Sequence, residues 1–149
     1  MGLSRRSRIY LGKRLLCDAA SSYDLCPPRG FLSYVTLGSR CTLRSVPISV
    51  LAAHAGCGYD DRHPANEDED NALLLMGEGY EPRSAERGSA LITVLSDKPS
   101  AILQMPRGNL EALYPRSLVL PHVMGLISKG EYGSAVEVMR RQKVDLNLL

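Results

Sequence analysis

Large aromatic side chains are scarce in this sequence, which contains no tryptophan and a single phenylalanine, Phe31. Its 149 residues include 13 glycines and 9 prolines, which interrupt regular structure. The core must therefore be built from leucine, valine, isoleucine and the seven tyrosines. A chain of this length with 44% hydrophobic residues is expected to form one core of short elements joined by many turns.

Long apolar runs and paired cysteines are missing as well. No stretch approaches the roughly 20 apolar residues of a membrane-spanning helix, and the amino end lacks the apolar stretch of a secretory signal. The four cysteines form no C-x-x-C pair, so neither a zinc ribbon nor a redox motif is indicated. We therefore expect an intracellular protein with reduced thiols, no membrane association and no cofactor.

The formal net charge of +2 is too small to drive nucleic-acid binding by counterion release. Charge is nevertheless unevenly distributed, because the middle of the chain carries the acidic run Glu67–Asp70. The amino end is basic through Arg5, Arg6, Arg8, Lys13 and Arg14. Such an end is more often solvated than bound, but it can contact RNA. A small RNA-binding protein that uses these five residues is therefore the alternative function.

Short apolar runs separated by turn residues fill residues 8–48, a pattern typical of a β-meander. Apolar side chains occupy both alternating faces of residues 31–37, so this strand is expected to be covered on both sides. Two further apolar runs, 89–95 and 100–105, are joined by Ser-Asp-Lys-Pro, which suits a turn. The sequence therefore predicts a second hairpin after the meander.

Between the two β regions the hydrophobicity collapses. Acidic residues, glycines and Pro64 dominate from about His54 to Asn71, so this stretch cannot bury enough apolar surface to offset its ordering entropy. We expect a disordered acidic loop over residues 54–85.

After Met105 the period of the apolar residues changes to that of a helix. The residues that share one helical face are Leu110, Leu113, Leu120, Met124 and Ile127. Pro115 suits the first turn of such a helix, where its missing N–H costs nothing, and Gly130 suits its end. A second helix is predicted over residues 132–143, which makes an antiparallel pair.

The segment Pro106–Asn109 thus stands between strand and helix. Arg107 beside Gly108 could hold an anion at a helix start, but phosphate-binding loops need several glycines at fixed offsets. A structural role is favoured, in which Gly108 supplies an unusual backbone angle and Asn109 caps a short helical turn. We therefore assign Pro106, Arg107, Gly108, Asn109 and Pro115 to a structural junction between two architectures.

Other chemistry finds little support. His54, Cys57 and His63 could be imagined around a metal ion, but a fourth ligand and regular spacing are missing. No G-x-S-x-G or comparable turn frames a serine as a nucleophile. We expect no catalytic, cofactor-binding or metal site, and therefore no enzyme.

The junction also carries a resemblance. Residues 86–120, ERGSALITVLSDKPSAILQMPRGNLEALYPRSLVL, resemble the family of large scaffold subunits of the Elongator complex, where the second β-propeller passes into an α-helical solenoid. Residues 130–149, GEYGSAVEVMRRQKVDLNLL, are similar to the next helix of that family. Residues 8–48 are similar, less specifically, to its last propeller strands. Family members are much longer, so the resemblance implies an internal fragment or an incomplete gene model.

The resemblance implies a mixed fold in which partial WD40-type propeller strands precede the start of a TPR-like α-solenoid. On that basis the chain divides into propeller strands (1–53), the acidic loop (54–85), a propeller hairpin (86–106) and the first solenoid helices (107–149). One departure is Pro121, inside the predicted helix. Its ring and missing N–H cost about 3 kcal/mol in a helix interior, so the helix is expected to kink or break.

The function that the resemblance implies is that of a non-catalytic scaffold. The complex modifies the wobble uridine of certain transfer RNAs, and the chemistry belongs to a different subunit. The expected partners are the other Elongator subunits, with tRNA engaged only indirectly through the complex. The expected localisation is cytoplasmic, with the nucleus as a second compartment.

Overall fold

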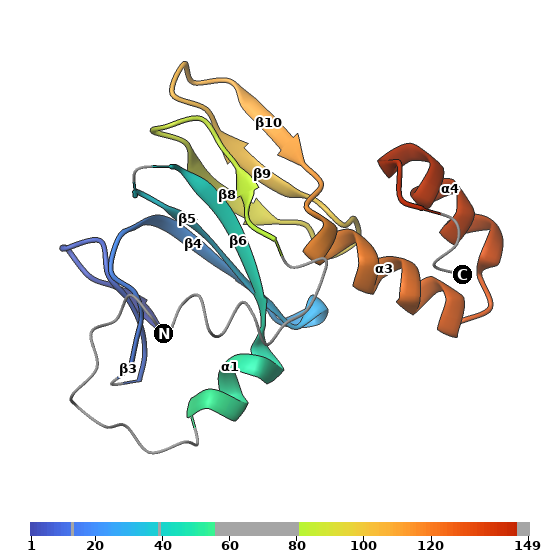
Figure 1. The fold of residues 1–149 in the computed structure, drawn as a ribbon, viewed down its shortest axis with the longest axis horizontal. Coiled ribbons are helices and arrows are strands. Elements are labelled where there is room, and N and C mark those ends of the chain that lie inside the picture. The colour runs from blue at the N-terminus through green and yellow to red at the C-terminus, as the bar shows by residue number, and fades with distance from the viewer. Residues whose placement is uncertain (13, 39, 56–80, 146–149) are drawn as a thin grey trace.

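The computed structural model describes residues 1–12, 14–38, 40–55 and 81–145, which run through short antiparallel strands into two helices (Figure 1). The first part comprises β1 (Gly2–Leu3), β2 (Ile9–Leu11), β3 (Arg14–Cys17), β4 (Ala20–Cys26), the 3-10 turn η1 (Pro27–Arg29), β5 (Phe31–Thr36), β6 (Thr42–Pro47) and α1 (Ile48–Ala55). The second part comprises β7 (Arg83–Ser84), β8 (Ala90–Val94), β9 (Ala101–Gln104), β10 (Leu110–Leu113), α3 (Arg116–Ser128) and α4 (Tyr132–Gln142).

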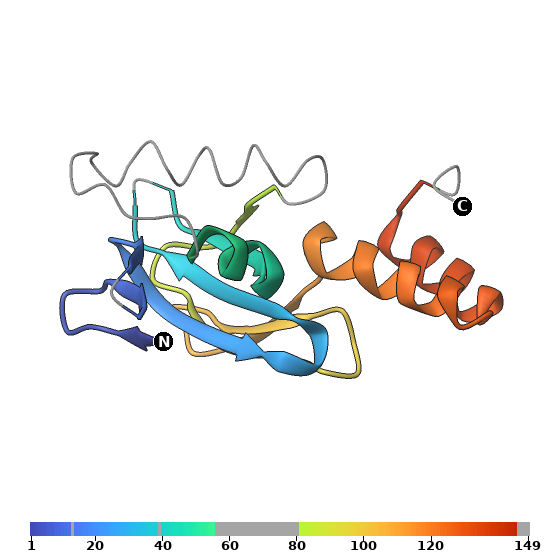
Figure 2. The ribbon, with the colours of Figure 1, turned by 90° about the horizontal axis from the view of Figure 1, so that it is seen from below.

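The strands form three sheets, in the orders β1-β2-β3, β4-β5-β6-β7 and β10-β9-β8. All the strand pairings within them are antiparallel. Figure 2 shows α3 and α4 projecting from one end of the sheets, away from the amino-terminal hairpin. The expected order of β structure followed by helices is confirmed in part, because α3 and α4 follow the described strands but α1 lies between β6 and β7. No described helix has the length and apolarity needed to cross a membrane.

The central strand is β5, in which all six residues are buried. Phe31 and Val35 enter one hydrophobic cluster, shared with β8, β9 and the start of α3. Leu32 and Tyr34 enter a second cluster on the opposite face, shared with β2 and β3. Alternate side chains of a strand point to opposite faces, so β5 is covered on both sides. The prediction for residues 31–37 is confirmed.

Several elements differ from the predictions. β4 was not anticipated, because its Ala-Ser-Ser-Tyr-Asp-Leu-Cys sequence is rich in residues that are depleted in strands. The helix α1 was not anticipated either. β7 lies within the stretch expected to be a disordered loop, so the carboxyl end of that prediction was wrong. Residues 56–80 of the predicted loop lie outside the described residues.

The largest correction concerns residues 107–115, which were predicted to begin a helix. Leu110–Leu113 instead forms β10, which pairs with β9 over four residue pairs from Leu110↔Gln104 to Leu113↔Ala101. Two leucines three positions apart fit a helical period, but so short a run cannot identify a helix by period alone. Leu110 is 64% exposed rather than buried on a helical face. The helical region begins at Arg116.

Pro121 lies inside α3, which continues as one helix from Arg116 to Ser128. The break expected as one outcome of this proline is therefore wrong. Pro121 is in the middle of the helix, where its missing N–H removes the bond to the Ser117 carbonyl without ending the helix. The second helix was predicted over residues 132–143 and is found at Tyr132–Gln142, which confirms it.

The turn between β9 and β10 gives a test of this assignment. Gly108 has φ +87°, and a Cβ there would meet nothing within 4 Å, so Gly108→Ala should be destabilising through backbone strain alone, by about 1 kcal/mol. Gly125 in α3 also has open space around it but no positive φ, so Gly125→Ala should be stabilising by about 0.5–1 kcal/mol. Urea denaturation of the two variants should give shifts of opposite sign. A stabilising Gly108→Ala would contradict the turn.

Candidate functional site

The predicted junction residues Pro106–Asn109 form the tight turn of the β9–β10 hairpin. The Met105 N–H donates to the Asn109 carbonyl at 2.8 Å, and the Gly108 N–H donates to the Met105 carbonyl at 2.8 Å. The Asn109 side-chain amide donates to Glu111 Oε1 at 3.0 Å, so Asn109 does not cap a helix. The predicted change of architecture at these four residues is therefore wrong, because a strand follows them.

The turn nevertheless packs against its neighbour. A Cβ at Gly88, whose φ is +92°, would lie 3.4 Å from Pro106 Cγ, so the β7–β8 turn approaches the β9–β10 turn closely. Arg87 and Arg107 are both exposed on these turns. They could contact an external group, but no described side chain joins them in a binding site.

The change from sheet to helix occurs at Pro115. Its backbone is extended, with φ −67° and ψ 143°, and its carbonyl accepts the N–H groups of Leu118 at 2.9 Å and Val119 at 3.0 Å. Pro115 is thus the capping residue before the helix rather than part of its first turn. Its fixed φ and missing N–H suit this position, since a helix start leaves N–H groups without partners. Of the five junction residues, Pro115 alone lies where the architecture changes.

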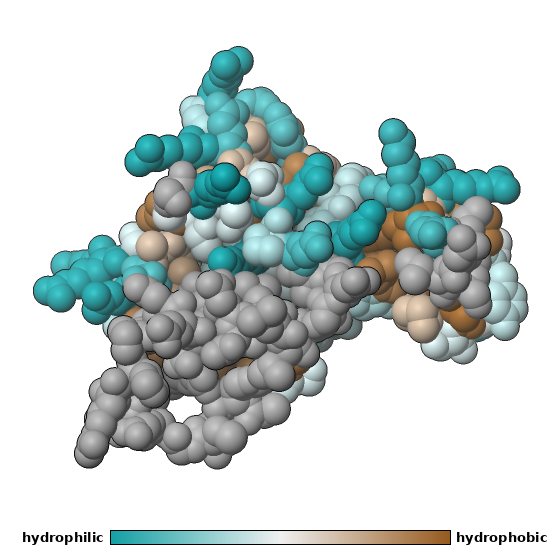
Figure 3. Space-filling model, in the orientation of Figure 1, coloured by the Kyte–Doolittle hydropathy of each residue, from teal (hydrophilic) through white to brown (hydrophobic). Residues whose placement is uncertain are grey.

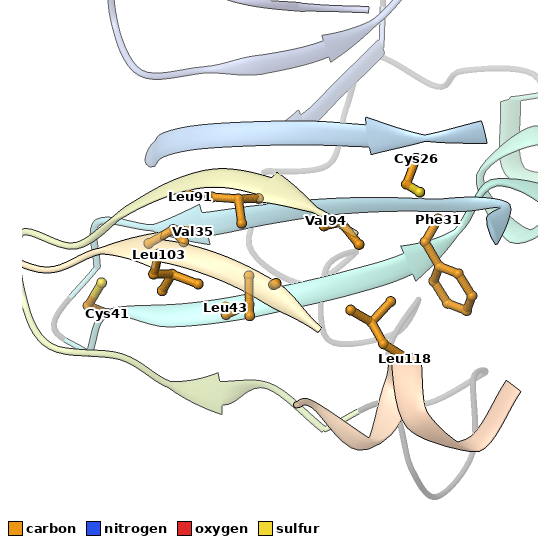
Figure 4. Packing of buried hydrophobic residues seen from close by; sticks show 10 residues of the cluster. Cys26, Phe31, Val35, Cys41, Leu43, Leu91, Val94, Leu103 and Leu118 are labelled. Atoms are coloured by element: carbon orange, nitrogen blue, oxygen red, sulfur yellow. The ribbon is translucent and has the colours of Figure 1, made fainter. Parts of the chain in front are cut away.

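Leu118 anchors the first turn of α3 in the sheets. It is 1% exposed and belongs to the same cluster as Phe31, Val35, Leu43 and Leu103. Figure 4 shows Leu118 reaching from the helix toward Phe31 and the strands that line this core. Burying a leucine side chain contributes about 1.5–3 kcal/mol, so this one residue is a substantial part of the attachment.

The rest of the helix pair has a core of its own. Val119, Val123, Ala135 and Met139 are buried between α3 and α4, together with Val144 after the second helix. Figure 3 shows hydrophobic residues gathered on the visible face of this pair, beside the polar surface of the sheets. The helices and the sheets therefore have separate cores that meet at the first turn of α3.

A second feature is a polar seam between β4 and β8, the edge strands of two different sheets. Asp24 Oδ2 accepts the Val94 N–H at 2.6 Å and the Thr93 hydroxyl at 3.1 Å. Ser22 Oγ accepts the Leu91 N–H at 2.6 Å. Side chains of β4 thus satisfy N–H groups of β8 that no strand pairs.

A bulge in β8 makes the seam possible. In a regular strand, N–H groups that point to the same edge are two residues apart, so those of Leu91 and Val94 would point in opposite directions. The register of β8 against β9 shifts between Leu91 and Thr93, and the extra residue brings both N–H groups to the β4 side. Ser22 and Asp24, two positions apart on β4, then face them.

Arg29 of η1 joins the sheets where the helices attach. Its Nε donates to the Leu95 carbonyl, just after β8, at 2.8 Å. Burial lowers the pKa of the guanidinium, and nearby Cys26 and Asp97 oppose that shift. His122 of α3 is half-buried, and its pKa is lowered by burial first and then by the charges of Arg29 and Lys129, against an opposing effect of Glu131.

Sequence reasoning missed Asp24, Arg29 and His122. In the sequence Arg29 stands out only as part of a Pro-Pro-Arg-Gly separator, and Asp24 lies in the strand that was not anticipated. The available signal in the sequence was the carboxylate of Asp24, which would share one face of a short strand with Ser22 and Cys26. Burying such a group requires hydrogen-bond partners, which here are supplied by a strand almost seventy positions away.

The remaining candidates are only partly described. Arg5, Arg6 and Arg8 are exposed around the β1–β2 turn, whereas Lys13 and the Arg14 side chain lie outside the described residues. Cys57, His63 and the His54 side chain also lie outside them, and the imagined metal site with them. Within the described ranges, no three His, Cys, Asp or Glu residues gather as a metal site. A cavity of about 350 Å³ is lined in part by Asp18, Arg40 and Arg44.

Several known proteins are similar in sequence to this chain. No protein-family model matches the chain. It is 35% identical over 149 residues, its full length, to Elongator complex protein 1 of Schizosaccharomyces pombe. It is 40% identical over 99% of its length to the protein of that name from Saccharomyces cerevisiae, and 45% identical over 67 residues to that of Drosophila melanogaster. The chain spans about a tenth of the length of the two yeast proteins, 11% and 10%.

Removal of the Asp24 carboxylate is expected to destabilise the fold strongly. Asp24→Ala leaves the Val94 N–H and the Thr93 hydroxyl without their acceptor, so it should lower the free energy of unfolding by about 2–4 kcal/mol. Asp24→Asn keeps an acceptor oxygen and should cost less. The matched control is Asp18→Ala, which removes an exposed carboxylate just before β4 and should change stability by less than about 0.5 kcal/mol. Equal effects of the Asp24→Ala and Asp18→Ala substitutions, measured by urea denaturation, would show that the seam is not a major contributor to the stability of the fold.

Proposed function

Because the chain belongs to the family of Elongator complex protein 1 and matches a segment of it along its full length, we propose that it acts as part of a non-catalytic scaffold of the Elongator complex. The full-length match is the observation that carries this proposal. Such a segment contributes shape and contact surface rather than reacting groups.

The order of the elements supports a position at the boundary between two modules. Four-stranded antiparallel sheets are the building units of β-propellers, and the sheet β4-β5-β6-β7 has this size. Antiparallel helix pairs with a core of their own are the units of α-solenoids, and α3 with α4 has that form. We propose that the sheets belong to the end of a WD40-type propeller and that the helices begin a TPR-like solenoid.

In this role the chain's partners are the other Elongator subunits. The complex supports modification of the wobble uridine in transfer RNA, and this segment engages tRNA only through the complex. The proposed localisation is cytoplasmic, and also nuclear. The attachment at Pro115 and Leu118 supports a scaffold role, because it joins two cores by a short buried contact rather than by a long linker.

A chimera tests the scaffold proposal. Residues 1–149 replace the matching segment of Saccharomyces cerevisiae Elongator complex protein 1, to which they are 40% identical, and the tagged chimera is purified from yeast. It should recover the other subunits as the unaltered yeast protein does. The matched variants are Leu118→Asp, which places a charge in the sheet core and should abolish recovery, and Arg116→Asp, which changes an exposed position and should not. A soluble chimera that recovers no other subunit contradicts the proposal.

The alternative function, RNA binding by the basic amino end, has one structural observation in its favour. The β1–β2 turn is closed by the Ser4 N–H donating to the Arg8 carbonyl at 2.8 Å, and the Ser7 carbonyl accepts the Ala20 N–H at 2.7 Å. The turn therefore holds Arg5, Arg6 and Arg8 outward on a fixed backbone.

Replacement of these three arginines by alanine separates the two functions. If the turn binds RNA phosphates, the triple variant should bind tRNA more weakly, and the salt dependence should flatten by about one unit of slope for each phosphate that is no longer neutralised. The charge-matched control replaces the equally exposed Arg87, Arg107 and Arg116. Equal binding by both triple variants, measured by filter retention across a salt series, would rule out this use of the amino end.

A further inference from the structure

The cavity of about 350 Å³ lies between the amino-terminal hairpin and the β4–β7 sheet. One side is formed by the end of β3 and the link to β4, and the other by the β5–β6 turn and β6. Pockets for small molecules measure about 300–1,000 Å³, so this cavity has room for a small molecule. The residues that line it have no part in the contact between sheets and helices at Pro115 and Leu118.

Positive charge dominates the lining of this cavity. Arg40 and Arg44 both line it, and Asp18 is the one acidic residue among the described residues that do so. Asp18 is exposed, whereas Arg44 is half-buried and its Nε and Nη1 nitrogens are buried. The attraction between a guanidinium and an anion becomes stronger as water is excluded. The lining therefore favours an anion over a neutral ligand or a cation.

Two threonines add hydroxyl groups to the same wall. Thr42 and Arg44 lie two positions apart on β6, so their side chains point to the same face of the sheet. The Oγ1 atoms of Thr36 and Thr42 are 2.9 Å apart, and Thr36 Oγ1 also accepts the Thr42 N–H at 3.2 Å. When the Thr36 hydroxyl donates to Thr42, the O–H of Thr42 remains for an external acceptor. This wall thus presents a hydroxyl donor and a guanidinium on one face of β6.

We propose that this cavity binds the phosphate group of a small phosphorylated molecule, with Arg40 and Arg44 as its charged donors and Thr42 as a neutral donor. A phosphate monoester carries about −1.5 to −2 charges at neutral pH and three acceptor oxygens, which match two guanidiniums and a hydroxyl. A phosphodiester of RNA carries one charge and two free oxygens, so it matches this set of donors less well. The site goes beyond the proposed scaffold function and does not depend on it.

Backbone amide resonances of the full chain report binding during titration with inorganic phosphate and, separately, with ribose 5-phosphate. The N–H of Thr42, whose acceptor is Thr36 Oγ1, should shift in a saturable way with each compound. Tighter binding of ribose 5-phosphate would show that the group attached to the phosphate enters the cavity. Equal binding would show that the phosphate group alone is recognised.

Three variants and one control test the assignment of the donors. Arg44→Gln removes a charged donor and should weaken phosphate binding by about tenfold or more. Arg40→Gln changes an exposed position and gives the same test if the first variant does not fold. Asp18→Asn removes the opposing charge and should strengthen binding. The matched control is Arg87→Gln, which replaces an exposed arginine on the β7–β8 turn, outside the cavity, and should leave the affinity unchanged.

The phosphate site is overturned if the Thr42 amide shows no saturable shift with either compound. It is also overturned if Arg40→Gln weakens binding no more than Arg87→Gln does. A single-stranded RNA that shifts the Thr42 amide at a lower concentration than inorganic phosphate and ribose 5-phosphate would overturn the assignment to a small molecule.

Discussion

The structure depends on side chains that join two sheets, among which the carboxylate of Asp24 makes two hydrogen bonds. No strand of the β4–β7 sheet pairs with a described strand of the β8–β10 sheet, so backbone ladders do not fix their relative position. Asp24 accepts from the N–H of Val94 and the hydroxyl of Thr93, and Ser22 and Arg29 make further bonds from the first sheet to β8 and the residue after it. A charged acceptor makes such bonds stronger than those between neutral groups, and the edge of β8 is satisfied without a further strand. The hydrophobic cluster between these sheets, including Val35 and Leu91, holds them together as well.

The helices depend in turn on this core. Leu118 inserts beside Phe31, which lies at one end of β5, the strand that is buried on both faces. The direction in which α3 leaves the sheets is therefore set by three successive constraints. The seam positions the sheets, the sheets shape the pocket for Leu118, and Pro115 fixes the backbone just before the helix begins. Each constraint is local, but together they determine where α4 lies.

The sequence was informative where one periodicity or one residue type dominated. The apolar residues on both faces of β5 and the Ser-Asp-Lys-Pro turn of the β8–β9 hairpin identified those elements, and Tyr132–Gln142 was long enough for its helical period to be recognised. β10 was misread because Leu110 and Leu113 fit a helix as well as a strand, and only pairing with β9 decides between them. The partners of Asp24 could not be identified from the sequence, since they belong to a distant strand whose bulge no local pattern predicts. Contacts between residues that are distant in sequence determine the elements that neither residue propensity nor hydrophobic periodicity predicts.

The residues Pro106–Asn109 illustrate why a resemblance in sequence can identify a family and still place the boundary between sheet and helix at the wrong residues. A tight turn restricts its sequence: Gly108 and, in the neighbouring turn, Gly88 both have positive φ angles, which favour glycine. Such restrictions make a segment recognisable, but they arise from the turn itself rather than from any boundary between modules. The boundary at Pro115 and Leu118 requires only an extended residue followed by an apolar helix, which many sequences satisfy. The positions that determine where the helices leave the sheets are therefore among the least distinctive in the sequence.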